Sequence, residues 1–85
     1  MSVDTQEALR SRVRAKLAAR LQEEPGLPWL SDTEPLASAG IDSVLLITVV
    51  GELEQELGAV LPDDAVLDGA SIESLAAALH RGERR

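Results

Sequence analysis

The residues best suited to chemistry form a short run, Gly40-Ile41-Asp42-Ser43, at the start of a predicted helix. A primary hydroxyl at the first turn of a helix lies beside free backbone N–H groups and the positive end of the helix dipole, so a phosphate on that oxygen would be stabilised. Gly40 leaves room for another protein to approach, and the Asp42 carboxylate could guide a basic partner or join a metal that the partner holds. The alternative is that Asp42 and Ser43 only cap the helix, which is the commoner role of such residues.

Other reactive residues are scarce. His80 is the only histidine, and at the end of a predicted helix it is better explained by a favourable interaction with the helix dipole. Glu52, Glu54 and Glu56 alternate, so a helix would spread them around its axis and not build a metal site. Nucleotide-binding and EF-hand loops are missing from the sequence, and the absence of cysteine excludes disulfides and cysteine-based metal clusters. We therefore predict no catalytic residue and no metal site, and we expect any chemistry to come from an attached group.

Helical periodicity sets the expected fold. Apolar residues recur at helical spacing over 4–22, 43–57 and 71–81, and a single turn is expected at 63–67 after a proline. The core positions predicted by this spacing are Leu9, Val13, Leu17, Leu21, Leu46, Val49, Val50, Leu53, Leu57, Ile72, Leu75, Ala76 and Leu79. The 85 residues are 45% apolar but only 1% aromatic, which suits packed helices. We predict an all-α fold in one domain, residues 1–85: a small antiparallel bundle of three main helices plus one short helix.

A long loop, residues 23–42, joins the first two predicted helices, and loops of this length are usually functional or disordered. Leu27, Trp29, Leu30 and Leu36 are its apolar residues, and we expect them to pin it across the bundle. Trp29, the only aromatic residue, either plugs the loop, which is the interpretation we favour, or serves recognition.

The second predicted helix has an apolar flank outside its core face. Val44 and Ile47 fall on this flank together with Ser43, which makes it a candidate contact surface. A helix buried on two sides is the alternative. Gly51 lies on the same flank and weakens the helix by roughly 1 kcal/mol relative to alanine. It either permits close approach of a partner or has no role.

Charge is distributed unevenly along the chain, which has a net charge of −7. Residues 1–22 carry five bases and two acids, whereas residues 23–79 carry twelve acids and no base. An acidic surface repels nucleic acid and anionic membranes and attracts basic proteins, so we expect a docking face for protein partners. A surface that only keeps the protein soluble is the alternative. No signal peptide or membrane span is visible, and a cytoplasmic monomer is expected.

Three stretches of the sequence resemble one known family. The run Asp-Thr-x-Pro-Leu-x-x-x-Gly-Ile-Asp-Ser, from Asp32 to Ser43, is similar to the phosphopantetheine attachment region of acyl carrier and peptidyl carrier proteins. Leu-Glu-Gln-Glu-Leu-Gly-x-x-Leu-Pro-Asp, residues 53–63, resembles the second helix of that family and its following loop, and Ser-Ile-Glu-Ser-Leu, residues 71–75, resembles the start of its final helix. The resemblance covers residues 5–80 in the family's order and spacing.

The resemblance implies a carrier that is a substrate of enzymes and not itself an enzyme. A phosphopantetheinyl transferase would attach 4′-phosphopantetheine from coenzyme A to Ser43, and the thiol of this arm would hold acyl or aminoacyl groups as thioesters. The other implied partners are a loading enzyme and downstream synthase or tailoring enzymes. Asp42, Val44, Ile47 and Gly51 would border the modified serine and meet these partners, with Gly40 and Ile41 supporting the motif.

The type of carrier is less sharply indicated. Discrete fatty acid carriers usually have acids two and five residues after the serine, where this chain has Leu45 and Thr48. This difference favours specialised polyketide or nonribosomal peptide biosynthesis, with fatty acid synthesis as the alternative. A short chain with basic ends is expected for a freestanding carrier, although an excised module would look identical. The alternative of another class is a helical interaction module that is never modified.

Overall fold

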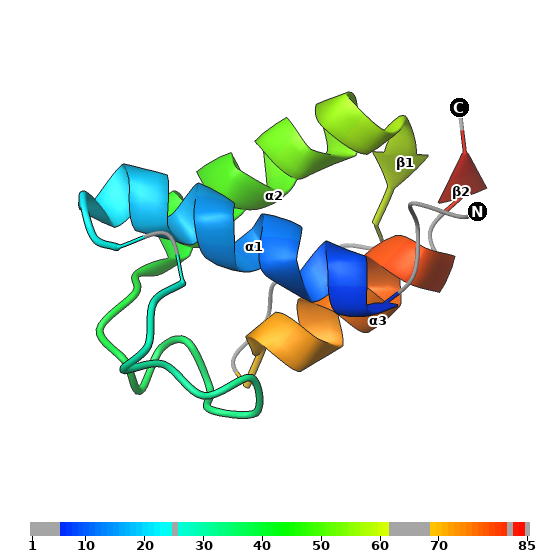
Figure 1. Cartoon of the computed structure of the whole chain (residues 1–85). Helices are drawn as coiled ribbons and strands as arrows, with labels where there is room; N and C mark the ends of the chain where they lie inside the picture. The colour runs from blue at the N-terminus through cyan, green and yellow to red at the C-terminus, as the bar shows by residue number, and fades with distance from the viewer. Residues whose placement is uncertain (1–5, 25, 62–68, 82, 85) are drawn as a thin grey trace.

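The residues that the structure describes form three helices (Figure 1). The computed structural model describes residues 6–24, 26–61 and 69–81 and the backbone of 83–84. Helix α1 spans Gln6–Leu21, α2 spans Ser43–Leu57 and α3 spans Ile72–Arg81. α1 runs in the opposite direction to α2 and α3, and the loop that follows α1 gathers at one end of the bundle. The predicted all-α fold is confirmed.

The helix ends follow from local capping. Asp42 is the N-cap of α2, and Gly58 ends this helix in the left-handed conformation with its N–H donating to the Glu54 carbonyl. α3 begins one residue later than predicted because Ser71 caps it: the Ser71 and Ser74 hydroxyls accept hydrogen bonds from each other's backbone N–H groups. α1 ends one residue earlier than predicted. Its predicted start at residue 4 and the predicted turn at 63–67 lie outside the described residues.

A two-residue antiparallel pairing was not predicted. Strand β1, Ala59–Val60, pairs with strand β2, Glu83–Arg84. The left-handed turn at Gly58 leaves the next two residues extended, so their backbone groups are free to pair with the segment after α3. Periodicity cannot reveal so short a pairing between distant segments.

The core is aliphatic and lies where the three helices meet. Eleven of the thirteen predicted core positions are buried, and the other two, Leu21 and Leu57, pack against the core while remaining partly exposed. The buried helix residues are Leu9, Val13, Leu17, Ala18, Leu46, Val49, Val50, Leu53, Ile72, Leu75, Ala76, Ala78 and Leu79. The hydrophobic burial of these side chains is what holds the bundle together.

The long loop is anchored by leucines but not by its tryptophan. Leu27, Leu30 and Leu36 are buried, whereas Trp29 is 50% exposed. The expectation that Trp29 plugs the loop is therefore wrong. Leu30 N–H donates to the Leu27 carbonyl, and this turn directs the two leucines into the core while Pro28 and Trp29 between them face outward.

Arg14 of α1 ties the loop to the bundle. Its Nη1 donates to the carbonyls of Gly26 and Leu27, at 3.0 and 2.9 Å, and its Nε and Nη2 donate to Asp32 Oδ1 at 3.2 and 2.7 Å. The Asp32 carbonyl accepts from the N–H of Glu73 at 2.9 Å, which connects the loop to α3. The loop that leads to Ser43 is therefore fixed against two helices.

Candidate functional site

Ser43 is the first residue of α2, and its side chain is exposed. Asp42 directly before it has extended backbone, and its Oδ1 accepts a hydrogen bond from the Leu45 N–H at 2.8 Å. The capping role considered for Asp42 is thus real. The Ser43 hydroxyl has no hydrogen-bond partner among the described residues, so it is available for attachment of another group.

The two residues before Asp42 hold the approach to the serine. Ile41 is only 5% exposed, and its N–H donates to the Leu36 carbonyl at 3.1 Å, so it anchors the end of the loop in the core. Gly40 has a positive φ of 88°, which explains the glycine, since other residues rarely adopt this conformation. Nothing lies within 4 Å of the position a Gly40 Cβ would occupy, so the space beside Gly40 is open.

The flank of α2 that follows Ser43 faces outward. Val44 is 73% exposed and Ile47 57% exposed, whereas the neighbouring Leu46 is buried in the core. The helix is therefore not buried on two sides. Gly51 is half-buried, and nothing lies within 4 Å of its Cβ position. Thr48, which the sequence reasoning did not place on this flank, is exposed there too; its spacing of four residues from Val44 is the signal that could have found it.

The acidic middle of the chain is partly neutralised by α1. Asp32 pairs with Arg10 at 3.5 Å and with Arg14, while Glu52 pairs with Arg20 and lies 3.7 Å from Lys16. The expectation of an acidic docking face without counter-charges is therefore wrong for Asp32, Glu52 and Glu56. A charge count along consecutive residues cannot show that bases of the first helix lie across from acids of the second.

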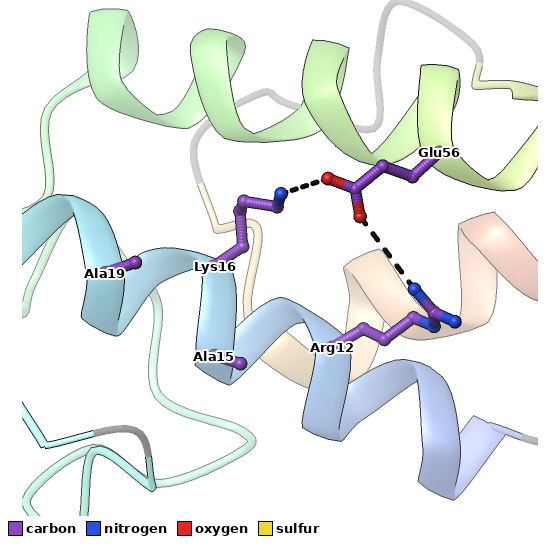
Figure 2. Close-up of a pocket in the computed structure, with 5 residues that line it drawn as sticks. All are labelled: Arg12, Ala15, Lys16, Ala19 and Glu56. Carbon is purple, nitrogen blue, oxygen red and sulfur yellow. Dashed lines mark hydrogen bonds and ion pairs between the residues drawn. The ribbon is translucent and has the colours of Figure 1, made fainter.

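A shallow depression of about 220 Å³ lies between α1 and α2. Figure 2 shows Arg12 and Lys16 on α1 both reaching toward Glu56 on α2, with Arg12 Nη1 3.8 Å from Glu56 Oε1. Ala15 and Ala19 complete the lining. Because its charged groups are paired with one another, the depression is a junction of two helices and offers no arrangement for catalysis.

The described residues form neither a cluster of metal ligands nor a membrane-spanning helix. Across residues 6–24, 26–61 and 69–81, no three histidine, aspartate or glutamate side chains gather as metal ligands would. None of the described helices has the length and apolar character that crossing a membrane requires. His80 is exposed at the end of α3.

Comparison with known proteins identifies the family. The sequence profile of the family described as a phosphopantetheine attachment site matches residues 11–79. The chain belongs to this family. Its members are carrier domains, not catalysts, and they hold a covalently attached 4′-phosphopantetheine prosthetic group. The exposed hydroxyl at the α2 N-terminus and the open space beside Gly40 fit such a group.

A polyketide synthase is among the relatives. The chain is 39% identical over 51 residues to the non-reducing polyketide synthase aoiG of Aspergillus oryzae, a match that covers 60% of this chain. The matched region makes up only 2% of that synthase. No solved structure gives a significant match to the chain.

Proposed function

We propose that Ser43 is the attachment residue and that residues 1–85 form a single carrier domain for specialised polyketide or nonribosomal peptide biosynthesis. A phosphopantetheinyl transferase would move 4′-phosphopantetheine from coenzyme A to Ser43. A bond would form between Ser43 Oγ and the phosphorus that carries the arm, the diphosphate bond of coenzyme A would break, adenosine 3′,5′-bisphosphate would leave, and the hydroxyl proton would pass to a base of the transferase or to water. The thiol of the bound arm holds acyl or aminoacyl groups as thioesters. The observation that carries this proposal is the exposed Ser43 at the first turn of α2, inside the matched family region.

The protein's own residues position the attachment oxygen. Asp42 fixes the first turn of α2 by accepting from Leu45 N–H, and Ile41 anchors the preceding backbone in the core. The phosphodiester would lie at the positive end of the α2 dipole, which favours its negative charge. Partner enzymes would contact the surface around Ser43 that is formed by Asp42, Val44, Ile47 and Gly51.

The relative and the start of α2 together favour polyketide biosynthesis. The matched relative is a polyketide synthase. Discrete fatty acid carriers typically have acids at the positions of Leu45 and Thr48. Here Leu45 packs against the core, and the Thr48 hydroxyl donates to the Val44 carbonyl at 2.9 Å. The partners would be the transferase, an acyl- or aminoacyl-loading enzyme, and synthase or tailoring enzymes that act on the tethered intermediate; the carrier itself would be a monomer.

Incubation with coenzyme A and a promiscuous phosphopantetheinyl transferase tests the proposal. Intact-mass spectrometry should show that the wild-type chain gains the mass of one arm and that Ser43→Ala gains none. Ser38→Ala is the matched control, since Ser38 is an exposed loop serine shortly before the site, and it should be modified like the wild type. A wild-type chain that stays unmodified with several transferases would instead support a helical interaction module.

A further inference from the structure

One side chain of α1 holds the first half of the loop that leads to Ser43. Arg14 donates to the carbonyls of Gly26 and Leu27, and it also donates twice to Asp32 Oδ1. We name these four hydrogen bonds the Arg14 clamp. The Arg14 side chain is only 20% exposed, and a guanidinium fixes the direction of its partners as well as their distance. The clamp therefore sets the orientation of the loop backbone against α1.

The clamp holds a strained piece of backbone. Leu27 has a φ of 44°, a value that residues other than glycine rarely adopt. Such a conformation persists only where the surrounding structure enforces it. The Leu27 side chain is buried, and Arg14 binds the Leu27 carbonyl at 2.9 Å. We therefore expect this turn to relax to another conformation when the Arg14 donors are removed.

The buried leucines of the loop do not replace the clamp. Leu27, Leu30 and Leu36 place the loop on the core, but hydrophobic burial is non-directional. It keeps the side chains out of water without fixing how the backbone between them runs. Only the hydrogen bonds of the clamp supply that direction for residues 26–32.

Two backbone hydrogen bonds join the clamped loop to the start of α3. The Asp32 carbonyl accepts from the Glu73 N–H at 2.9 Å, and the Leu36 N–H donates to the Ala70 carbonyl at 2.8 Å. The first N–H groups of a helix have no partner inside that helix, so the loop supplies the acceptor for Glu73. The same residue that the clamp binds by its carboxylate is thus also bound by its backbone.

We propose that the Arg14 clamp positions Ser43 for the phosphopantetheinyl transferase, which makes Arg14 a positioning residue for the attachment reaction. This inference rests on attachment at Ser43. The Leu36 carbonyl accepts from the Ile41 N–H at 3.1 Å, and Ser43 follows Ile41 by two residues. With the clamp intact, the backbone before the serine keeps the conformation that the enzyme binds. Without it, only a fraction of the molecules has this conformation, and the apparent KM rises by the reciprocal of that fraction.

Removal of the Arg14 donors tests the proposal. Arg14→Met keeps a long side chain on α1, and its KM as a transferase substrate should rise at least about fivefold, with kcat little changed. Arg12→Met is the matched control, because Arg12 is exposed on the same helix and pairs with Glu56, away from the loop. Its KM should stay within about twofold of the wild-type value. A smaller rise for Arg14→Met, or an equal rise for both variants, overturns the proposal.

Amide hydrogen exchange separates a change in the loop from a change in the bundle. In Arg14→Met the Glu73 N–H should lose most of its protection, because its acceptor is on the loop. The Val49 N–H inside α2 should keep its protection. A Glu73 N–H that stays protected in this variant overturns the proposal, since the leucines would then hold the loop without the clamp.

Substitutions of Asp32 test the clamp from the loop side, and they decide the question if Arg14→Met unfolds the bundle. Asp32→Ala removes the acceptor and should raise KM at least about threefold. Asp32→Asn keeps an oxygen that can accept from Arg14, so its KM should stay within about twofold of the wild-type value. A transferase that binds the Asp32 charge directly would discriminate against both variants equally, and that result contradicts the inference.

The two proposals fail in different ways. Modification of the wild type at Ser43, with no effect of Arg14→Met or Asp32→Ala on KM, overturns only the positioning inference. A wild-type chain that no transferase modifies overturns the proposed attachment and, with it, the inference.

Discussion

The two faces of α2 are both apolar, but only one of them is used in folding. Leu46, Val49, Val50 and Leu53 are buried in the core, whereas Val44 and Ile47 on the opposite side are more than half exposed. Mean apolar content therefore says little about which residues stabilise this helix. The position of each residue around the helix axis decides whether it supports the fold or remains available for contact.

The largest difference between the faces should appear on truncation of Leu53. Leu53 is 1% exposed, so Leu53→Ala removes buried methyl groups and leaves a cavity. We expect the free energy of unfolding to fall by about 2–5 kcal/mol. Urea denaturation followed by circular dichroism measures this change.

Ile47→Ala is the matched control for the exposed face. The side chain is 57% exposed, so its truncation should change the unfolding free energy by less than about 0.5 kcal/mol. Comparable losses for Leu53→Ala and Ile47→Ala would show that both faces are used in folding and would remove the contrast.

Loss of the Asp42 cap should affect both faces, since both begin at the first turn of α2. Asp42→Ala removes the acceptor for the Leu45 N–H, and we expect a loss of about 1 kcal/mol in unfolding free energy. Asp42→Asn keeps a capping oxygen and should recover most of this stability in the same urea titration. Equal stability of Asp42→Ala and the wild type would argue that the cap contributes nothing.

Gly51→Ala, on the exposed face of α2, should stabilise the protein, whereas truncation on the buried face destabilises it. No atom lies within 4 Å of the added Cβ, so the helix should gain about 0.5–1 kcal/mol without a clash. Thermal unfolding should show a higher Tm. A lower Tm would mean that Gly51 is needed for folding and not for close approach.

The charged flank of α2, formed by Glu52 and Glu56, should contribute least to the free energy of unfolding. The Glu52 and Glu56 side chains are 33% and 42% exposed and pair with similarly placed bases, and such surface pairs contribute between zero and about 1 kcal/mol. The double variant Glu52→Gln, Glu56→Gln should therefore be only slightly less stable at low salt and equal to the wild type at high salt. A large loss that persists at high salt would contradict this.

Local patterns predicted much of the fold and of the candidate site. The buried side of α2 follows from helical spacing, and Gly58 marks its end because a left-handed residue there needs no Cβ. The exposure of Ser43 at a helix start follows from the same spacing. Each of these features depends on residues within a few turns of one another, which is why the sequence alone could indicate them.

Features that depend on distant residues could not be predicted. Glu56 pairs with Lys16, 40 residues earlier, and Asp32 binds Arg14, 18 residues earlier. Neither pairing leaves a periodic signal in the sequence. The prediction for Trp29 was wrong for a related reason. The aliphatic residues already fill the core, so the turn between Leu27 and Leu30 directs the tryptophan outward.

The outward position of Trp29 also determines how this protein can be observed by fluorescence. It is the chain's only aromatic residue and sits half in water on the loop, so its emission starts from a partly hydrated state. Melting of the helices should therefore shift the emission maximum little. A change in that maximum when another protein is added would instead report contact at the loop, with no dye attached to the carrier.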